Sequence, residues 1–255
     1  MLFLVGCEIE NSLLFQTDPT DRYRLPDNTI PVDSLQEVEI LTSDSLRLAA
    51  IWARRPEDGP TVVFFHGQGG NIDAFWDRVM GLWDAGVAVL IVDYRGYGKS
   101  EGEPSEIGLY RDGRATLEFA LGQGVEAQRL ILWGASLGSA VATHVATEFE
   151  VGAVVLDGAF TSMEDMVAQS SPLGLPGDWV IESEWDNLSR VDELLGPVVI
   201  AHGRKDGVVP FSMGERLFTH AGLPKEFVAV DDGRHNDLIV EHLDVILPTV
   251  LAALD

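Results

Sequence analysis

Residues 134–138 of the chain are Gly134-Ala135-Ser136-Leu137-Gly138. The residues just before them, 129–133, are mostly aliphatic, and residues 139–146 combine small and aliphatic side chains. We therefore expect a buried strand before Ser136 and a packed helix after it. The glycines leave room for a sharp turn that holds Ser136 in strained geometry at the strand end. This pattern is typical of a nucleophile elbow, although a plain glycine-serine turn would have the same composition.

The chain on both sides of this motif alternates between apolar and amphipathic segments. The predicted strands are residues 61–65, 87–92, 129–133, 152–156, 197–201 and 226–230. The predicted helices are residues 73–85, 106–121, 136–148, 211–221 and 236–253. Such alternation predicts an α/β fold, with a mostly parallel sheet covered by helices on both faces. Residues 38–42 and 46–52 flank a short polar link and predict an N-terminal antiparallel hairpin.

Length and charge limit the remaining possibilities. A chain of 255 residues fits one core, so we expect a single domain over residues 36–255. The prolines in residues 1–35 predict an irregular lead-in over the surface. The chain has 41 acidic and 17 basic residues, and its net charge of −24 repels phosphate backbones. Nucleic acid is therefore an unfavourable partner.

The cysteine Cys7 ends the apolar stretch 2–7. This stretch resembles the lipobox of bacterial lipoprotein signals, in which the cysteine is lipidated and anchors the protein to a membrane of the cell envelope. It departs from that pattern because no basic residue precedes it. Two interpretations stay open: a membrane-anchored lipoprotein, or a cytoplasmic protein with an apolar N-terminal segment.

In parallel sheets, ligands bind beyond the carboxyl ends of the strands. The strand at 61–65 is followed by His66-Gly67-Gln68-Gly69-Gly70. Glycines let a backbone approach a ligand closely, so we expect the N–H groups of Gln68 and Leu137 to form an oxyanion hole. We expect His66 to brace this loop by hydrogen bonds.

Two later strand ends carry an acid and a histidine. Asp206 follows the strand at 197–201, and His235 follows the strand at 226–230. A serine hydroxyl needs an imidazole to take its proton, and a buried carboxylate fixes the tautomer of that imidazole. The order Ser136, Asp206, His235 therefore predicts a catalytic triad that needs no metal and no organic cofactor. Asp157, which ends the strand at 152–156, is the alternative acid.

The segment 93–100 also follows a strand and contains Gly96 and Gly98. It has no third glycine at dinucleotide spacing, and the chain has no P-loop sequence. We therefore expect a structural loop in which Asp93 and Arg95 make local hydrogen bonds.

From about residue 36 to its end, the chain resembles the α/β-hydrolase superfamily. Within it, the chain is similar to compact bacterial hydrolases of the serine-aminopeptidase-like or Bem46-like kind. The resemblance rests on the loop 66–71, the segment 93–100, Phe160-Thr161-Ser162 and His202-Gly203-Arg204-Lys205-Asp206, besides the elbow and His235. It implies esterase or acyl-protein thioesterase activity. Arg234 departs from the family pattern, in which glycine usually precedes the histidine, and we expect it to face solvent.

The gap between the strands at 152–156 and 197–201 leaves room for only a small lid, a minimal cap within residues 160–190. The apolar residues Leu173, Leu175, Trp179 and Val180 would line one wall of a small, partly open acyl pocket. The expected function is that of a serine hydrolase of short to medium carboxylic esters, with thioesters as a second class. The alternatives are an aminopeptidase-like amide hydrolase and a non-catalytic, membrane-anchored binding protein.

Overall fold

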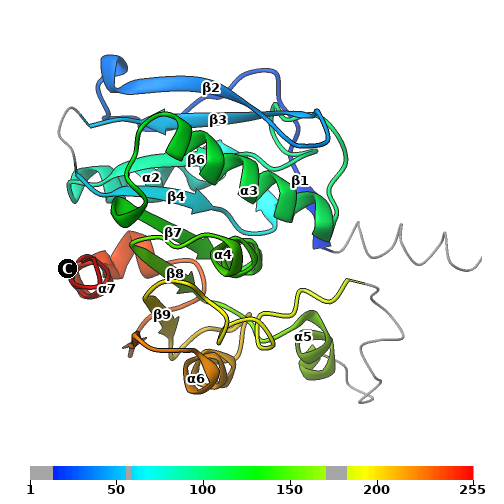
Figure 1. Ribbon diagram of the computed structural model, residues 1–255, viewed down its shortest axis with the longest axis vertical. Coiled ribbons are helices and arrows are strands. Elements are labelled where there is room, and N and C mark those ends of the chain that lie inside the picture. Colours follow the sequence, from blue (N-terminus) through cyan, green and yellow to red (C-terminus); the bar gives the residue numbers. More distant parts are fainter. Residues whose placement is uncertain (1–13, 56–58, 171–182, 255) are drawn as a thin grey trace, which may run out of the picture.

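A computed structural model describes residues 14–55, 59–170 and 183–254 (Figure 1). Cys7 lies outside the described residues, so its lipidation stays a prediction. The four apolar residues expected along the acyl pocket, Leu173, Leu175, Trp179 and Val180, also lie outside them. Within the described ranges, no helix is both long and apolar enough to cross a bilayer.

Eight of the described strands form one sheet in the order β10-β9-β8-β7-β4-β6-β3-β2. Their bounds are β2 Leu35–Leu41, β3 Arg47–Ala53, β4 Thr61–Phe65, β6 Ala88–Val92, β7 Leu130–Ala135, β8 Ala153–Asp157, β9 Val198–Gly203 and β10 Lys225–Val230. Strands β6, β4, β7, β8, β9 and β10 run parallel, and β3 pairs antiparallel with both β2 and β6. The predicted parallel sheet with an antiparallel hairpin at its edge is confirmed.

Helices cover both faces of the sheet (Figure 1). They are α2 Trp76–Asp84, α3 Glu106–Gly122, α4 Leu137–Glu148, α5 Met163–Ser170, α6 Phe211–His220 and α7 Leu238–Ala252. Short 3-10 turns occur at η1 Val32–Ser34, η2 Ile72–Phe75 and η3 Ala127–Arg129. The buried side chains of α2 and α7 belong to the core on one face, and those of α3, α4 and α6 to the core on the other.

The central strands are buried on both faces, as continuous apolar runs predict. All five residues of β4, β6 and β8 are buried. The observed bounds of the six parallel strands lie within two residues of the predicted ones, because glycine, proline or polar residues bound each apolar run. The edge strand β2 begins three residues before the predicted hairpin strand at 38–42.

The lead-in differs from the prediction of a segment that only crosses the surface. Leu14, Phe15, Tyr23 and Ile30 are buried. A short strand β1, Gln16–Thr17, pairs in parallel with β5, Gly69–Gly70. These isolated apolar residues show no helical or strand period, so periodicity could not have revealed their burial.

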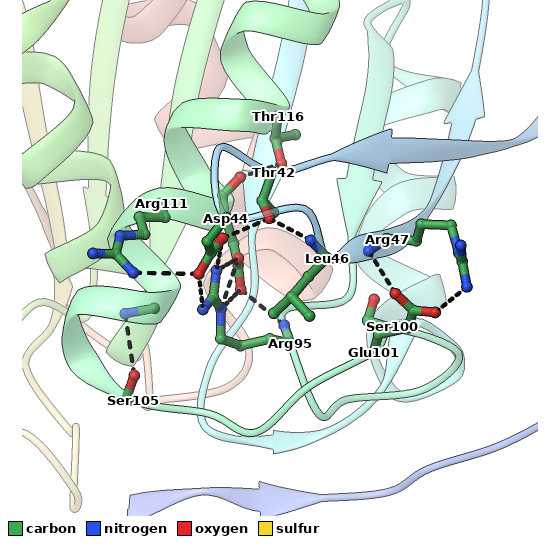
Figure 2. A network of polar contacts seen from close by, with 12 residues as sticks. Thr42, Asp44, Leu46, Arg47, Arg95, Ser100, Glu101, Ser105, Arg111 and Thr116 are labelled. Carbon is green, nitrogen blue, oxygen red and sulfur yellow. Dashed lines mark hydrogen bonds and ion pairs between the residues drawn. The ribbon is translucent and has the colours of Figure 1, made fainter.

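Arg95 joins three distant parts of the chain rather than making only local bonds (Figure 2). Its Nε and Nη2 donate to Asp112 on α3 at 2.9 and 2.7 Å, and its Nη1 donates to Asp44 in the β2–β3 turn at 2.9 Å. Asp93 likewise accepts from Tyr23 and from the Ile72 N–H, 70 and 21 residues away. The loop is structural, as expected, but its partners are long-range.

Candidate active site

The turn between β7 and α4 places Ser136 in strained backbone geometry. Its φ is 52° and its ψ is −116°, a region that side-chain-bearing residues rarely occupy. The two flanking glycines are sterically required. A Cβ on Gly134 would lie 2.3 Å from the Gly138 carbonyl oxygen, and one on Gly138 would lie 2.0 Å from the Phe65 carbonyl oxygen. This geometry is what the sequence predicted for a nucleophile elbow.

The structure brings together the three side chains that the sequence nominated as a triad. The Ser136 hydroxyl donates to His235 Nε2 at 3.0 Å. The opposite ring nitrogen, Nδ1, donates to Asp206 Oδ2 at 2.8 Å. The three residues follow β7, β9 and β10, and they are 70 and 29 residues apart in the sequence. Arg234, beside the histidine, is exposed as expected.

Asp206 is buried and held at both oxygens. Oδ1 accepts the backbone N–H groups of Val208 and Val209, both at 2.8 Å. The ring of His202, also fully buried, has its Nε2 3.4 Å from Oδ2. Burial alone would raise the pKa of Asp206, but the hydrogen bonds from His202, His235 and the backbone hold it well below its usual range. The carboxylate is therefore charged at neutral pH.

The alternative acid, Asp157, sits in a different environment. Its Oδ2 accepts from Trp133 Nε1 at 3.2 Å, and burial raises the pKa of Asp157 to about 6 even though this bond opposes the rise. His235 Nδ1 already donates to Asp206, so the two acids do not compete for the imidazole. The geometry favours Asp206 as its partner.

The loop after β4 is held in place by hydrogen bonds to its backbone carbonyl groups. Because a carbonyl can only accept, the short contact of His66 Nδ1 with the Gly67 carbonyl, 2.7 Å, means that the ring donates. Tyr97 Oη and the Gln16 N–H donate to the Gln68 carbonyl at 2.7 and 3.0 Å. In a trans peptide, C=O and N–H point in opposite directions, so the Gln68 N–H points away from His66. His66 therefore braces the loop, as expected.

Gln68 and Leu137 line the same cavity as Ser136 and His235. Leu137 is the first residue of α4, so its N–H has no partner within the helix. The cavity has a volume of about 410 Å³. Its apolar wall consists of Ala74, Phe75, Leu137, Phe160, Met163, Met166, Val208 and Val209. An ester carbonyl beside Ser136 could thus face two backbone N–H groups, with its chain along apolar side chains.

Gly158 is a site residue that the sequence reasoning did not single out. It has a φ of 55°, and a Cβ there would lie 3.2 Å from His235 Nδ1. The glycine thus leaves space for the imidazole beside its carboxylate partner. A glycine directly after a strand-end acid was the only available signal, and many turns share it.

Three potential metal-ligating side chains gather at the start of α7: Asp237, Glu241 and His242, whose ligand atoms lie within 4.8 Å of one another. Asp237 already accepts the Arg234 N–H at 2.7 Å and so stabilises the turn before the helix. The group is partly exposed and does not line the cavity beside Ser136. We assign it no metal.

Comparison with known proteins gives consistent similarities. A profile described as the alpha/beta hydrolase family matches residues 62–191. Rv2307c of Mycobacterium tuberculosis, an uncharacterized protein, is 34% identical over 205 residues, covering 79% of this chain and 73% of the relative. Protein bem46 of Schizosaccharomyces pombe is 31% identical over 216 residues, covering 79% and 71%. The solved structure of the esterase Pf2001 of Pyrococcus furiosus has a TM-score of 0.74 at 22% identity, covering 94% and 98%.

Proposed function

Since this chain belongs to the alpha/beta hydrolase family, we propose that it is a serine esterase that cleaves carboxylic esters of short to medium acyl chains. Thioesters, which have the same electrophilic carbonyl, are the second substrate class. The observation that carries the proposal is the continuous chain of contacts from Ser136 through His235 to Asp206, opening on an apolar cavity.

The proposed reaction has two steps. Ser136 Oγ bonds to the ester carbonyl carbon while its proton passes to His235 Nε2, and the backbone N–H groups of Gln68 and Leu137 stabilise the oxyanion. His235 then gives the proton to the departing alcohol oxygen as the C–O bond breaks, leaving an acyl-enzyme. Water, deprotonated by His235, attacks this acyl group, and the acid leaves as Ser136 regains its proton.

Asp206 supports both steps without taking the proton. Its carboxylate is charged at neutral pH, because hydrogen bonds hold its pKa below the usual range. It accepts from His235 Nδ1, which leaves Nε2 as the base toward Ser136. The imidazolium formed in each step is stabilised by the same negative charge.

The test is hydrolysis of p-nitrophenyl acetate and butyrate, with labelling by a fluorophosphonate probe. We expect the wild type to cleave the esters and to be labelled at Ser136. Ser136→Ala should lower kcat/KM by about 10⁴-fold or more and abolish labelling.

Ser189→Ala is the matched control, because Ser189 is an exposed hydroxyl outside the cavity. We expect it to be labelled like the wild type. Equal labelling of wild type and Ser136→Ala, together with no ester hydrolysis by the wild type, would contradict the proposal.

A further inference from the structure

Arg78, on α2, is a charged side chain in the wall of the cavity beside Ser136. Its guanidinium lies 5.1 Å from the ring centroid of Phe75, which also lines the cavity. Its side chain is only 12% exposed. A cation is therefore held, largely out of bulk water, within the space where the substrate chain would lie.

The guanidinium is incompletely paired. Nη1 donates to Asp77 at 3.0 Å, but Asp77 is 52% exposed, so this ion pair is screened by solvent. Nη2 donates to the Asn236 carbonyl at 2.9 Å. Among the described residues, Nε donates to no acceptor, and each terminal nitrogen carries a second N–H. Several donors in a planar fork thus remain for a ligand.

The charge of the cavity is opposite to that of the whole chain. The chain has 41 acidic and only 17 basic residues. Yet no carboxylate side chain is found among the described residues that line the cavity, where Arg78 is the one permanently charged group. The carboxylates of Asp157 and Asp206 are buried behind that lining. An anionic group in the cavity would meet the cation of Arg78, whereas an ammonium would meet that cation with no carboxylate in the lining to bind it.

We propose that the substrates are esters that carry a carboxylate, such as monoesters of dicarboxylic acids, and that Arg78 binds this carboxylate. The inference rests on the proposed esterase function for the cleavage of these esters. The binding of a carboxylate by Arg78 does not depend on that function. It also disfavours an aminopeptidase, which would need an acid in the cavity to hold the substrate ammonium.

The hydrolysis test compares mono-p-nitrophenyl adipate with p-nitrophenyl hexanoate, whose acyl chains have equal length. We expect the wild type to favour the adipate ester in kcat/KM by about tenfold or more, the size of a charge-assisted hydrogen bond. Arg78→Gln should lower this ratio by about tenfold. Arg114→Gln, which removes an equal charge from an exposed position on α3, should leave the ratio unchanged.

Arg78 also donates to the Asn236 carbonyl in the loop of His235. The experiment must therefore distinguish carboxylate binding by Arg78 from a purely structural role. In that case Arg78→Gln would lower both esters together and leave the ratio as in the wild type. Such a result, or a wild type that does not favour the adipate ester over the hexanoate ester, would overturn the inference.

A binding measurement separates this inference from the proposed function. In the Ser136→Ala variant, calorimetry should show monomethyl adipate binding about tenfold more tightly than methyl hexanoate, which has no carboxylate, with the difference lost in Ser136→Ala/Arg78→Gln. Equal binding of the two esters to Ser136→Ala would overturn the inference even if the wild type hydrolyses both p-nitrophenyl esters. Failure of the esterase function would instead appear as no turnover by the wild type with monomethyl adipate binding intact.

Discussion

The network around Arg95 and the trio around His235 are built from the same kinds of contact. Each joins three segments that are far apart in the sequence, and each places a buried carboxylate against a nitrogen donor. The Arg95 network is closed, because all three guanidinium nitrogens donate to Asp44 or Asp112 (Figure 2). The His235 trio is open, because its last member, Ser136, lines a cavity.

This difference separates a structural network from the trio that we propose to be reactive. In the closed network each guanidinium nitrogen of Arg95 donates to a carboxylate, and the network holds the hairpin, the loop after β6 and α3 together. In the open trio, the hydroxyl has a base behind it and free volume in front, on a backbone with a positive φ. Strain and free volume beside a relay of hydrogen bonds support the proposed catalytic role of the trio, whereas carboxylate acceptors on all three guanidinium nitrogens support a structural role for the Arg95 network.

The comparison predicts the largest effect for a substitution of Asp206, the carboxylate partner of His235. In Asp206→Asn the amide oxygen would keep the N–H groups of Val208 and Val209, which leaves the amide NH₂ facing His235 Nδ1. Nδ1 must then accept, so the proton sits on Nε2 and the imidazole cannot take the proton of Ser136. We expect kcat/KM for p-nitrophenyl butyrate to fall by about 10⁴-fold.

Asp157→Asn is the matched control for that variant, since Asp157 is a buried acid at the end of the neighbouring strand. Its amide oxygen can still accept from Trp133, and we expect less than about a tenfold change in kcat/KM. A greater loss in Asp157→Asn than in Asp206→Asn would reverse the assignment of the acid.

The second effect is on stability rather than rate. Arg95→Met would leave the fully buried carboxylate of Asp112 without its cation, and we expect the free energy of unfolding to fall by about 3–5 kcal/mol in urea titrations. Arg111 also pairs with Asp44 but is 50% exposed, so Arg111→Met should cost at most about 1 kcal/mol. Equal losses in the two variants would show that burial does not set the strength of this network.

The smallest expected effect concerns Asp93, a buried acid that, unlike Asp112 in the Arg95 network, has no cation bonded to it. Burial raises the pKa of Asp93 to about 7, against the hydrogen bonds from Tyr23 and Ile72 that lower it. Between its unfolded value near 4 and this value, the folded state binds more protons than the unfolded state, so stability falls as pH rises. From pH 5 to 7, we expect wild type to lose about 2 kcal/mol relative to Asp93→Asn.

That difference would be measured as the free energy of unfolding of both proteins at each pH. Asp33→Asn, which changes an exposed acid, should follow the wild type across the same range. A constant gap between wild type and Asp93→Asn from pH 5 to 7 would contradict the prediction.

The sheet and the three polar residues at its edge could be predicted from the sequence for one physical reason. Buried parallel strands are continuous apolar runs, and the residues that follow each run must lie at the same edge. Ser136, Asp206 and His235 each follow such a run, so their convergence could be expected before any distance was known.

Other features depend on contacts that no local pattern reports. Asp157 and Asp206 both lie at strand ends, and the bond from His235 Nδ1 to Asp206, which no local pattern predicts, distinguishes them. Arg78 lies on a helix whose period identifies its buried face, but not which polar residue meets a loop 158 residues away. The apolar residues of the lead-in fill gaps in the core one at a time, so they carry no periodic signal.

The hydrogen bond from the Gln16 N–H to the Gln68 carbonyl gives the two ends of the described chain unequal access to the site. A tag fused upstream of β1 would strain a segment that is hydrogen-bonded to the loop containing Gln68, a proposed donor to the oxyanion. The other end is remote: Leu254 lies beside Gly152, which precedes β8, whereas Ser136 and Asp206 follow β7 and β9 at the opposite edge of the sheet. For immobilisation on a sensor surface, attachment beyond α7 would therefore leave the proposed active site free of strain and facing away from that surface.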